Sequence, residues 1–496
     1  MKRLPPHFRV RVAKKYDATR RKYRFNVVFE TVVEPSKRVV AVSEAFGLGL
    51  DEERGFAVYR DFTLEFGPGD VVYIVGESGS GKSVLLREIR RALGEEAVDM
   101  GEVDVDVARD VPIVETVGWD VEEAVRLLAS VGLGDAFVML RSYEQLSDGQ
   151  KYRYRMAKLL ESKADYWICD EFCSLLDRDT ARVVAFNMQR LARRLGKCLI
   201  VATCHRDLFE DLNPSVYVEK GFGAEVSVQY RPNEPAKECS LLREISIEEG
   251  CFADFLRLSE FHYRGAKRFP VLRVFRAVRR GFVAGAIVYS PPPIHCWGRR
   301  YAFSRLPRLG ELNRYFANIS RVVVHPRFRM IGLGVRLVRE TLGLVGRAYV
   351  ETSAVMARYN PFFERAGMKK IAVKEPNQDL LKALKLLEAL GFRRELMASQ
   401  AYNRRVLARL EAEGLLSEAK KALSHVRNVP IYRTLVRKTY PKVADWHNAL
   451  ERASTTELAK VLTKVASTVQ PKVYLLWRNP AIPKCPLDKY LKVELR

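Results

Sequence analysis

The chain has 496 residues, of which 48% are hydrophobic and 29% charged. This length and composition indicate roughly two to four globular domains rather than a disordered or fibrous chain. No apolar run approaches the ~20 residues of a membrane-spanning helix, and the first residues lack the apolar stretch of a signal peptide, so the sequence predicts a cytoplasmic protein with no membrane partner.

The net charge of +24 is concentrated in two blocks. Residues 1–40 carry twelve Lys/Arg against three acidic residues, and residues 264–329 carry fifteen against Glu311 alone. Concentrated positive charge implies an extended anion as partner, with RNA or another nucleic acid as the leading candidate. Both blocks interleave arginine with aromatic residues, a pattern that suits phosphate binding with base stacking. The alternative is a solvated thermophile surface or a CoA-phosphate site.

The eight cysteines include no Cys-x-x-Cys pair. Cys169 and Cys173 flank Asp170-Glu171, and we expect two buried, reduced thiols there rather than a metal site.

A phosphate-binding loop follows the apolar run 71–75, which predicts a buried strand. Residues 76–83 read Gly-Glu-Ser-Gly-Ser-Gly-Lys-Ser and lead into a helical pattern. Glycines let backbone N–H groups close around phosphates, and a helix N-terminus favours negative charge. We expect Lys82 to reach the β- and γ-phosphates of ATP and Ser83 to bind Mg²⁺. The residues predicted to hold the nucleotide here are Gly76, Ser78, Gly79, Ser80, Gly81, Lys82 and Ser83.

Two further apolar strands end in polar residues. The strand at 165–170 ends in Asp170, which we expect to bind Mg²⁺, and Glu171 then fits the general base for the attacking water. The strand at 199–203 is followed by His205.

The pentapeptide 146–150, Leu-Ser-Asp-Gly-Gln, lies between these elements. The whole set resembles ABC-type ATPases. The resemblance implies that residues 174–177 form the D-loop and that His205 contacts the γ-phosphate. It also implies that Ser147 and Gly149 touch ATP held by a second copy of the chain, so that the protein is a homodimer. Phe46 is the candidate that stacks on adenine, with a core aromatic as the alternative.

The ATPase half departs from transporter ATPases in its spacing. Only about 65 residues separate Lys82 from Ser147, and no glutamine lies between Lys82 and Gln145, so the glutamine of the family's Q-loop is missing. Glu115 is the candidate substitute. The shortened segment argues against transport.

A second glycine motif lies in the second half of the chain. A β-branched strand at 319–324 precedes Arg329-Met330-Ile331-Gly332-Leu333-Gly334 and a helical pattern at 335–342. This combination resembles motif A of GNAT acetyltransferases, where backbone N–H groups at a helix start bind the pyrophosphate of acetyl-CoA. The acetyl-CoA-binding residues implied by the resemblance are Val322, Val324, Arg329, Ile331, Gly332 and Gly334.

The sequence identifies the general acid and the general base of acetyl transfer less directly. Phe363 stands where many GNAT enzymes have a tyrosine, so Tyr359 is the candidate general acid and Glu351 the candidate base. His325 and Glu364 are alternative bases. For each, a structural role is the competing interpretation: Glu351 caps or pairs, and Tyr359 packs.

The predicted fold class is α/β, a P-loop ABC-type ATPase domain followed by an α+β GNAT domain and a helical C-terminal region. We predict a basic arm of strands at 1–40, the ATPase domain at 41–230, the GNAT-like domain at 231–375 and the helical region at 376–496. A late strand at 472–477 is a candidate to return to the GNAT sheet. The order of modules resembles an archaeal-type fusion of an ABC-type ATPase with a predicted GNAT N-acetyltransferase.

The leading hypothesis is an ATP-dependent acetyltransferase that uses ATP, Mg²⁺ and acetyl-CoA and acts on structured RNA. A second interpretation is an ABC ATPase that binds or remodels a nucleic acid or ribonucleoprotein, with the GNAT fold as a sensor or scaffold. A third is an ATP-gated protein N-acetyltransferase.

Overall fold

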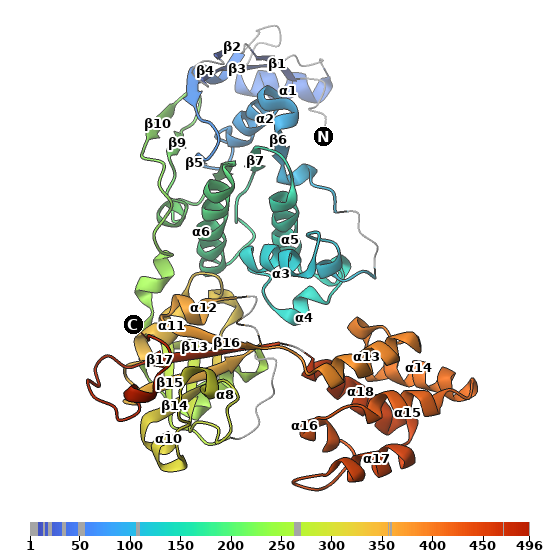
Figure 1. Ribbon diagram of the computed structural model, residues 1–496. Coiled ribbons are helices and arrows are strands. Elements are labelled where there is room, and N and C mark those ends of the chain that lie inside the picture. The colour runs from blue at the N-terminus through green and yellow to red at the C-terminus, as the bar shows by residue number, and fades with distance from the viewer. Residues whose placement is uncertain are drawn as a thin grey trace. The chain divides into compact units, whose positions relative to one another are not determined.

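The computed structural model describes residues 8–12, 15–17, 22–31, 36–47, 55–105, 110–261, 269–355, 357, 360–469 and 471–495 (Figure 1). The chain forms two compact units. Unit 1 comprises Met1–Arg268, Val274–Val288 and Arg321–Leu337, and unit 2 comprises Phe269–Arg273, Tyr289–Ser320 and Val338–Arg496. The boundary predicted at residue 231 therefore does not separate the units, because two later segments belong with the first one.

A four-stranded antiparallel sheet begins unit 1. Its strands are β1 (Phe8–Val12), β2 (Lys15–Asp17), β3 (Lys22–Thr31) and β4 (Gly55–Glu65), in the order β1-β3-β2 with β4 on the other edge of β3. Helix α1 (Lys37–Phe46) lies between β3 and β4 in the chain. Since β3 pairs with β4, the N-terminal arm predicted at 1–40 shares its sheet with the segment predicted to follow it.

The central sheet of unit 1 has six strands in the order β10-β9-β5-β8-β7-β6. The strands are β5 (Val71–Gly76), β6 (Ala97–Asp99), β7 (Tyr166–Cys169), β8 (Cys198–Thr203), β9 (Val216–Lys220) and β10 (Val226–Tyr230). The neighbouring strands pair in parallel, except β9 with β10, which pair antiparallel. Its helices are α2 (Lys82–Leu93), α3 (Val121–Ser130), α4 (Ala136–Met139), α5 (Asp148–Glu161), α6 (Arg178–Leu195) and α7 (Phe209–Leu212).

Strand β5 shows why this sheet is stable. All six of its residues are buried, as expected for a parallel strand covered on both faces. Val71, Tyr73 and Val75 enter one apolar core, and Val72 and Ile74 enter the core on the opposite face. Because β5, β7 and β8 run parallel, the loops that follow them meet at one edge of the sheet, where parallel sheets bind their ligands.

A seven-stranded sheet has the order β11-β12-β13-β14-β15-β17-β16. Its strands are β11 (Ser246–Glu249), β12 (Arg273–Arg279), β13 (Phe282–Ser290), β14 (Phe316–Val324), β15 (Tyr349–Ala354), β16 (Lys369–Lys374) and β17 (Lys472–Arg478). Its helices are α8 (Phe252–Leu258), α9 (Arg299–Ala302), α10 (Leu309–Tyr315), α11 (Leu333–Thr341) and α12 (Phe362–Arg365). The late strand thus lies inside this sheet, between β15 and β16.

Strands β14 and β15 are parallel but pair only at their beginnings. The register runs from Phe316↔Tyr349 to Asn318↔Glu351, after which β15 continues against β17 alone. Beyond these three residue pairs, β14 and β15 no longer pair with each other.

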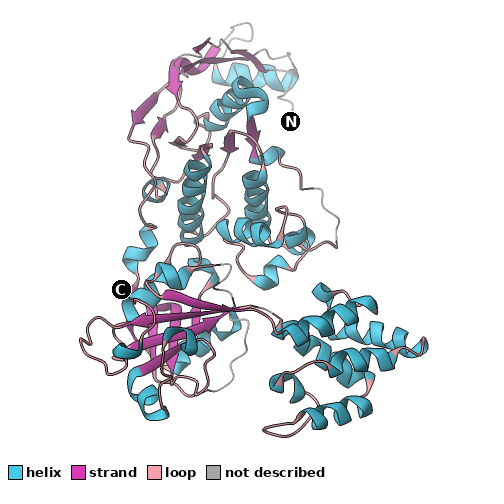
Figure 2. Cartoon of the chain, viewed as in Figure 1, coloured by secondary structure: helices cyan, strands magenta, loops and turns pink. Residues whose placement is uncertain are grey.

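A helical segment lies between β16 and β17 in the chain (Figure 2). It comprises α13 (Gln378–Ala389), α14 (Gln400–Ala412), α15 (Leu416–Ser424), α16 (Val429–Tyr432), α17 (Val443–Arg452) and α18 (Thr455–Thr468). The segment has its own apolar core, in which Leu407, Trp446 and Leu462 are fully buried. Within the described part of the chain, no helix is long and apolar enough to cross a membrane.

Candidate functional site

The loop after β5 has the geometry of an anion-binding turn. Gly79 and Gly81 have φ angles of 79° and 104°, in the region that favours glycine. The Lys82 ammonium donates to the carbonyl oxygens of Gly76 at 3.0 Å and Glu77 at 2.8 Å. These contacts hold the lysine inside the loop, beside the backbone N–H groups that open the first turn of α2.

Two more observations suit this loop to phosphate. The Ser80 hydroxyl is buried and has no partner among the described residues. A Cβ on Gly81 would lie 2.4 Å from Cγ1 of Val58, so no larger residue fits there. Ser83 lies in the first turn of α2, as a Mg²⁺ ligand requires, and Ser78 is exposed at the loop tip.

Asp170 and Glu171 follow β7 at the same edge of the sheet. The Asp170 carboxylate accepts the Glu171 N–H at 2.9 Å, and Glu171 has a φ angle of 48°. The Ser174 hydroxyl donates to the Glu171 carboxylate at 3.0 Å. Cys169 and Cys173 are fully buried, and burial raises the pKa of both thiols, in agreement with inert reduced cysteines.

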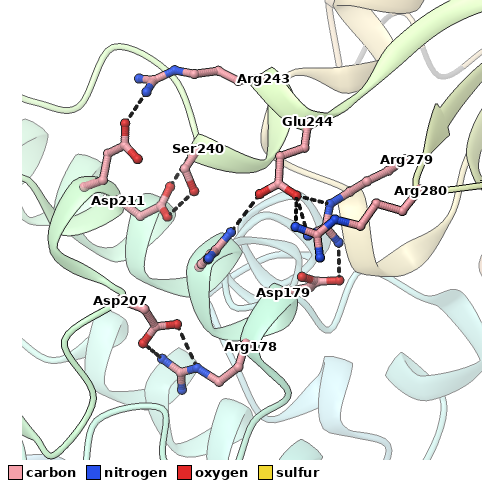
Figure 3. A network of polar contacts seen from close by, with 11 residues as sticks. Arg178, Asp179, Asp207, Asp211, Ser240, Arg243, Glu244, Arg279 and Arg280 are labelled. Atoms are coloured by element: carbon pink, nitrogen blue, oxygen red, sulfur yellow. Dashed lines mark hydrogen bonds and ion pairs between the residues drawn. The ribbon is translucent and has the colours of Figure 1, made fainter.

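His205 lies in the loop after β8, next to the other two loops. Its backbone carbonyl accepts the hydroxyl of Tyr73, and its N–H donates to the Thr203 hydroxyl at 3.3 Å. Two residues further on, Asp207 accepts both arms of the Arg178 guanidinium (Figure 3). The histidine loop is therefore tied to the first residue of α6, a link that no local sequence pattern indicates.

The pentapeptide 146–150 forms the N-terminus of α5. Ser147 is the N-cap residue, and the Gln150 side chain accepts its N–H at 3.1 Å. Leu146 is buried and anchors the turn, whereas Ser147 is exposed. A Cβ on Gly149 would lie 3.6 Å from the Leu176 side chain, so this turn adjoins the segment 174–177 of the same chain.

The structure gives no support for a nucleotide-binding role of Phe46 or Glu115. Phe46 ends α1 and is 76% exposed, and Glu115 ends the short helix η3 (Ile113–Glu115). The aromatic residue that the structure does place at the loop is Tyr59, whose hydroxyl donates to the Gly81 carbonyl at 3.0 Å. The Lys220 ammonium lies 5.0 Å from the Tyr59 ring centre. Neither Tyr59 nor Lys220 was predicted from the sequence to lie at this loop, and they come from strands β4 and β9.

The second glycine turn precedes α11. Met330 and Gly332 have φ angles of 67° and 97°, and a Cβ on Gly332 would meet no described atom within 4 Å. Glycine is therefore required by backbone conformation rather than by packing. Ile331 is buried beneath the turn, and Gly334 lies in the first turn of α11. Val322 and Val324 lie in the part of β14 beyond its pairing with β15.

The Arg329 side chain does not face this turn. Its guanidinium donates to the backbone carbonyls of Val324 at 3.1 Å, Phe261 at 3.2 Å and Gly134. The expectation that Arg329 binds acetyl-CoA is therefore limited to its backbone, because the side chain is held by other parts of unit 1.

Glu351 occupies a buried ion pair. Arg299 donates to both of its carboxylate oxygens, and the Tyr474 hydroxyl donates to one of them at 2.8 Å. Both side chains of the pair are at most 3% exposed. Burial and the Glu351 charge raise the pKa of the Tyr474 hydroxyl, which is therefore a permanent donor. The geometry corresponds to the structural alternative for Glu351 rather than to a free base.

The candidate acid is not located. Tyr359 lies outside the described residues, and Phe363 is a buried residue of α12. His325 packs against the rings of Phe261 and Phe282, at 4.9 and 5.1 Å between ring centres. Burial, with the charges of two neighbouring arginines, lowers the pKa of His325 to about 4.

Much of the basic block 264–329 is neutralised within the chain. The arginines of this block that form ion pairs are Arg276, Arg279, Arg280, Arg299, Arg305 and Arg327. In the N-terminal block, Lys22 and Arg24 pair with Glu65 and Asp61. The sequence count therefore overestimates the positive charge that is open to a partner.

Comparison with known proteins addresses the first half of the chain. The sequence profile of the AAA domain family matches residues 54–167. The methionine import ATP-binding protein MetN of Helicobacter hepaticus is 27% identical over 215 residues, which covers 35% of this chain and 60% of that protein. Its counterpart from Xanthomonas axonopodis pv. citri is 29% identical over 190 residues, covering 31% and 56%. The chain thus spans less than two thirds of the length of these relatives.

A solved dimeric ATP-binding cassette bound to ADP and Pi matches with a TM-score of 0.30 and 18% identity, over 36% of this chain and 94% of that chain. The sequence matches and the geometry of the three loops together define a mixed α/β P-loop ATPase domain of the ATP-binding cassette type, over about a third of the chain.

Proposed function

We propose that the protein is an ABC-type ATPase whose ATP cycle serves an acetyl-CoA-dependent acetyltransferase domain in the same chain. The observation that carries the proposal is the presence of two glycine turns at helix N-termini, one before α2 and one before α11. Such turns can bind phosphate groups. The first follows β5 of the six-stranded sheet and the second follows β14 of the seven-stranded sheet, which supports the proposal of two separate phosphate-bearing ligands.

The ATPase part would act as a two-chain clamp. Bound Mg²⁺-ATP supplies the phosphoryl group, Ser83 and Asp170 would hold the metal ion, and Glu171 would accept a proton from the attacking water. His205 would contact the γ-phosphate. The exposed Ser147, with Gly149, would meet ATP held by Lys82 of a second copy, so that ATP binding closes the dimer. Methionine import, named for the relatives, is not part of the proposal, because those matches cover only a third of the chain.

The acetyl-CoA site would use the Gly332–Gly334 turn for the pyrophosphate. The extended chain of acetyl-CoA would lie along the part of β14 that follows its three residue pairs with β15. Val322 and Val324 belong to that stretch.

The proposed acceptor is structured RNA. Support comes from α9 and α10, where Arg300 and Arg314 are exposed beside Tyr301 and Tyr315, at 4.7 and 5.5 Å from the ring centres. Arginine forks bind phosphates and aromatic faces stack bases, so each of these two pairs suits single-stranded parts of an RNA. Acetylation of an exocyclic amine is the reaction that would follow.

A second candidate function is favoured by the state of Glu351. A carboxylate held by Arg299 and a phenylalanine at position 363 suit a domain that binds CoA without transferring the acetyl group. The chain would then be an ATPase that binds or remodels a ribonucleoprotein, with the second domain as a ligand sensor.

Labelled acetyl-CoA separates these functions. The protein is incubated with [acetyl-¹⁴C]CoA and ATP, together with total tRNA, rRNA or protein. Label in RNA supports the proposed function, and label in protein identifies an ATP-gated protein acetyltransferase. CoA binding with no transfer to any pool identifies the sensor. If the RNA contacts six phosphates, the logarithm of its association constant should fall with the logarithm of the salt concentration at a slope of about −5. An association constant that does not change with salt would refute the RNA partner.

A further inference from the structure

The segment 325–329, which leads from β14 to the Gly332 turn, touches two elements of the ATPase domain. It contains the short helix η7 (Pro326–Phe328). Arg327 lies 3.8 Å from the carboxylate of Asp177 and 4.0 Å from that of Asp179. All of these residues belong to unit 1. The segment before the second glycine turn is thus in contact with the beginning of α6.

The β12–β13 hairpin makes a stronger contact with the same helix. Arg280 and Gly281 have φ angles of 49° and 81°, which form the tight two-residue turn of a hairpin. This turn places Arg279 between two carboxylates, with 2.6 Å to Asp179 and 2.8 Å to Glu244 (Figure 3). The Arg279 side chain is only 10% exposed, whereas Arg327 is 43% exposed. Arg279 is therefore the main link, since exposed ion pairs contribute little.

The hairpin is also joined to the segment 325–329. The His325 N–H donates to the Ala284 carbonyl of β13 at 2.9 Å. On the ATPase side, Asp179 is adjacent to Arg178, which holds Asp207 in the loop of His205. A path of polar contacts joined by short backbone segments thus runs from the loop of His205 through α6 and the hairpin to the residues before Gly332.

A second path leads to the pentapeptide 146–150. Arg329 donates to the carbonyl of Gly134, in the loop before α4. Two residues earlier in that loop, the Gly132 carbonyl accepts the Arg153 guanidinium at 2.8 Å. Arg153 also donates to the Gly149 carbonyl at 3.1 Å. Both parts of the ATP clamp, the histidine loop and the pentapeptide, are therefore linked to the two ends of η7.

We propose that Arg279 and Arg329 are positioning residues that couple the ATP state of the clamp to the conformation of the Gly332–Gly334 turn. Closure of the clamp around ATP would shift α6 relative to the loop at 132–134. The segment 325–329 is attached to both, so it would shift with them and change the turn that binds the CoA pyrophosphate. The affinity for CoA would then depend on ATP, and by linkage the affinity for ATP would depend on CoA. The CoA part of this inference rests on the proposed acetyl-CoA site.

The test uses the full-length chain and two measurements. Hydrogen exchange of residues 330–342 is compared with and without ATP in the Glu171→Gln background, which slows hydrolysis. CoA affinity is measured by calorimetry under the same two conditions. The variants are Arg279→Gln and Arg329→Gln, each of which breaks one path, and the conservative Arg279→Lys. Arg194→Gln, at the exposed far end of α6, is the matched control.

We expect ATP to change exchange in residues 330–342 and to change CoA affinity by at least about fivefold, the low end of measured allosteric couplings. Either glutamine variant should reduce the affinity change to below about twofold while still binding ATP, and Arg194→Gln should retain it. Lysine cannot bridge Asp179 and Glu244 as the arginine fork does, so Arg279→Lys should restore only part of the coupling.

The outcomes distinguish failure of the coupling from failure of the proposed acetyl-CoA site. Unchanged exchange in residues 330–342 on ATP binding would refute the coupling, whatever the result with CoA. A change in exchange that both glutamine variants preserve would refute the roles of Arg279 and Arg329. No binding of CoA under either condition, with the exchange response intact, would refute the acetyl-CoA site and leave the coupling of the turn to ATP established.

Discussion

Replacing Glu351 by glutamine distinguishes a structural carboxylate from a catalytic one. The substitution removes the negative charge opposite Arg299, a side chain that is 3% exposed. Arg299 still donates to the carbonyls of Pro293 and Ile294, at 2.7 and 3.0 Å. Removing one member of a buried ion pair typically costs about 3–5 kcal/mol, because the other charge remains buried. The glutamine retains some hydrogen bonds with Arg299 and Tyr474, so we take the lower figure, about 3 kcal/mol.

The measurement is native-state hydrogen exchange in β15 and β17, which pair at Glu351↔Leu476. A loss of about 3 kcal/mol corresponds to roughly 150-fold faster exchange of the protected amides in these strands, at 1.36 kcal/mol per factor of ten. Glu388→Gln, on the exposed face of α13, is the control and should leave exchange unchanged.

A triple variant distinguishes the effect of leaving Arg299 without its counter-charge from the effect of losing the polar side chains. Arg299→Met, Glu351→Leu and Tyr474→Phe together replace the polar cluster by apolar groups of similar size, a change that is often neutral in buried sites. We expect protection in β15 to return to within about tenfold of the wild type. If Glu351→Gln leaves exchange unchanged but abolishes acetyl transfer, our structural argument is refuted and Glu351 is the general base.

Three other predictions concern ATP and pH. Glu171→Gln should slow ATP hydrolysis by at least about 100-fold and yield an ATP-dependent dimer on size exclusion; a chain that stays monomeric would contradict the clamp. Gly81→Ala should abolish ATP binding in a filter assay, because its Cβ would lie 2.4 Å from Val58, whereas Gly310→Ala should bind normally. The lowered pKa of His325, about 4, means that the unfolded chain takes up a proton first as pH falls below the ordinary value of 6.5. The free energy of unfolding should therefore fall between pH 6.5 and 4, by about 1–2 kcal/mol after allowing for partial exposure. His325→Asn should lack this part of the pH dependence in urea titrations, and identical slopes would refute it.

The parts of the ATP site that were predicted from the sequence are those encoded in short segments. A glycine turn between a buried strand and a helix specifies its own backbone, so the loop at 76–83 is marked within a few residues. The same holds for the turn before α11. Tyr59 escaped prediction because its position at the Gly81 carbonyl depends on pairing of β4 in a different sheet.

The count of charged residues was the least reliable basis for predicting a binding surface, because it ignores ion pairs between residues that are distant in the sequence. Arg279 and Asp179 are separated by 100 residues, and Arg329 contacts a carbonyl 195 residues away. Long-range partners of this kind have no local pattern. Ion pairs of this kind neutralise part of the basic block 264–329, so the sequence count overestimates the charge open to an RNA.

The position of β17 has a consequence for synthesis on the ribosome. β15 and β16 leave the ribosome well before β17, which follows the helical segment, yet β17 is the strand that joins them. Until residue 478 has been made, the nascent chain carries two strands with unpaired edges, a state prone to association with other chains. The helical segment has a core of its own and can fold during this interval, which keeps the ends of β16 and β17 close and lowers the entropic cost of inserting the last strand. A chain that ends before Lys472 would retain the ATPase loops but expose an open edge at β15.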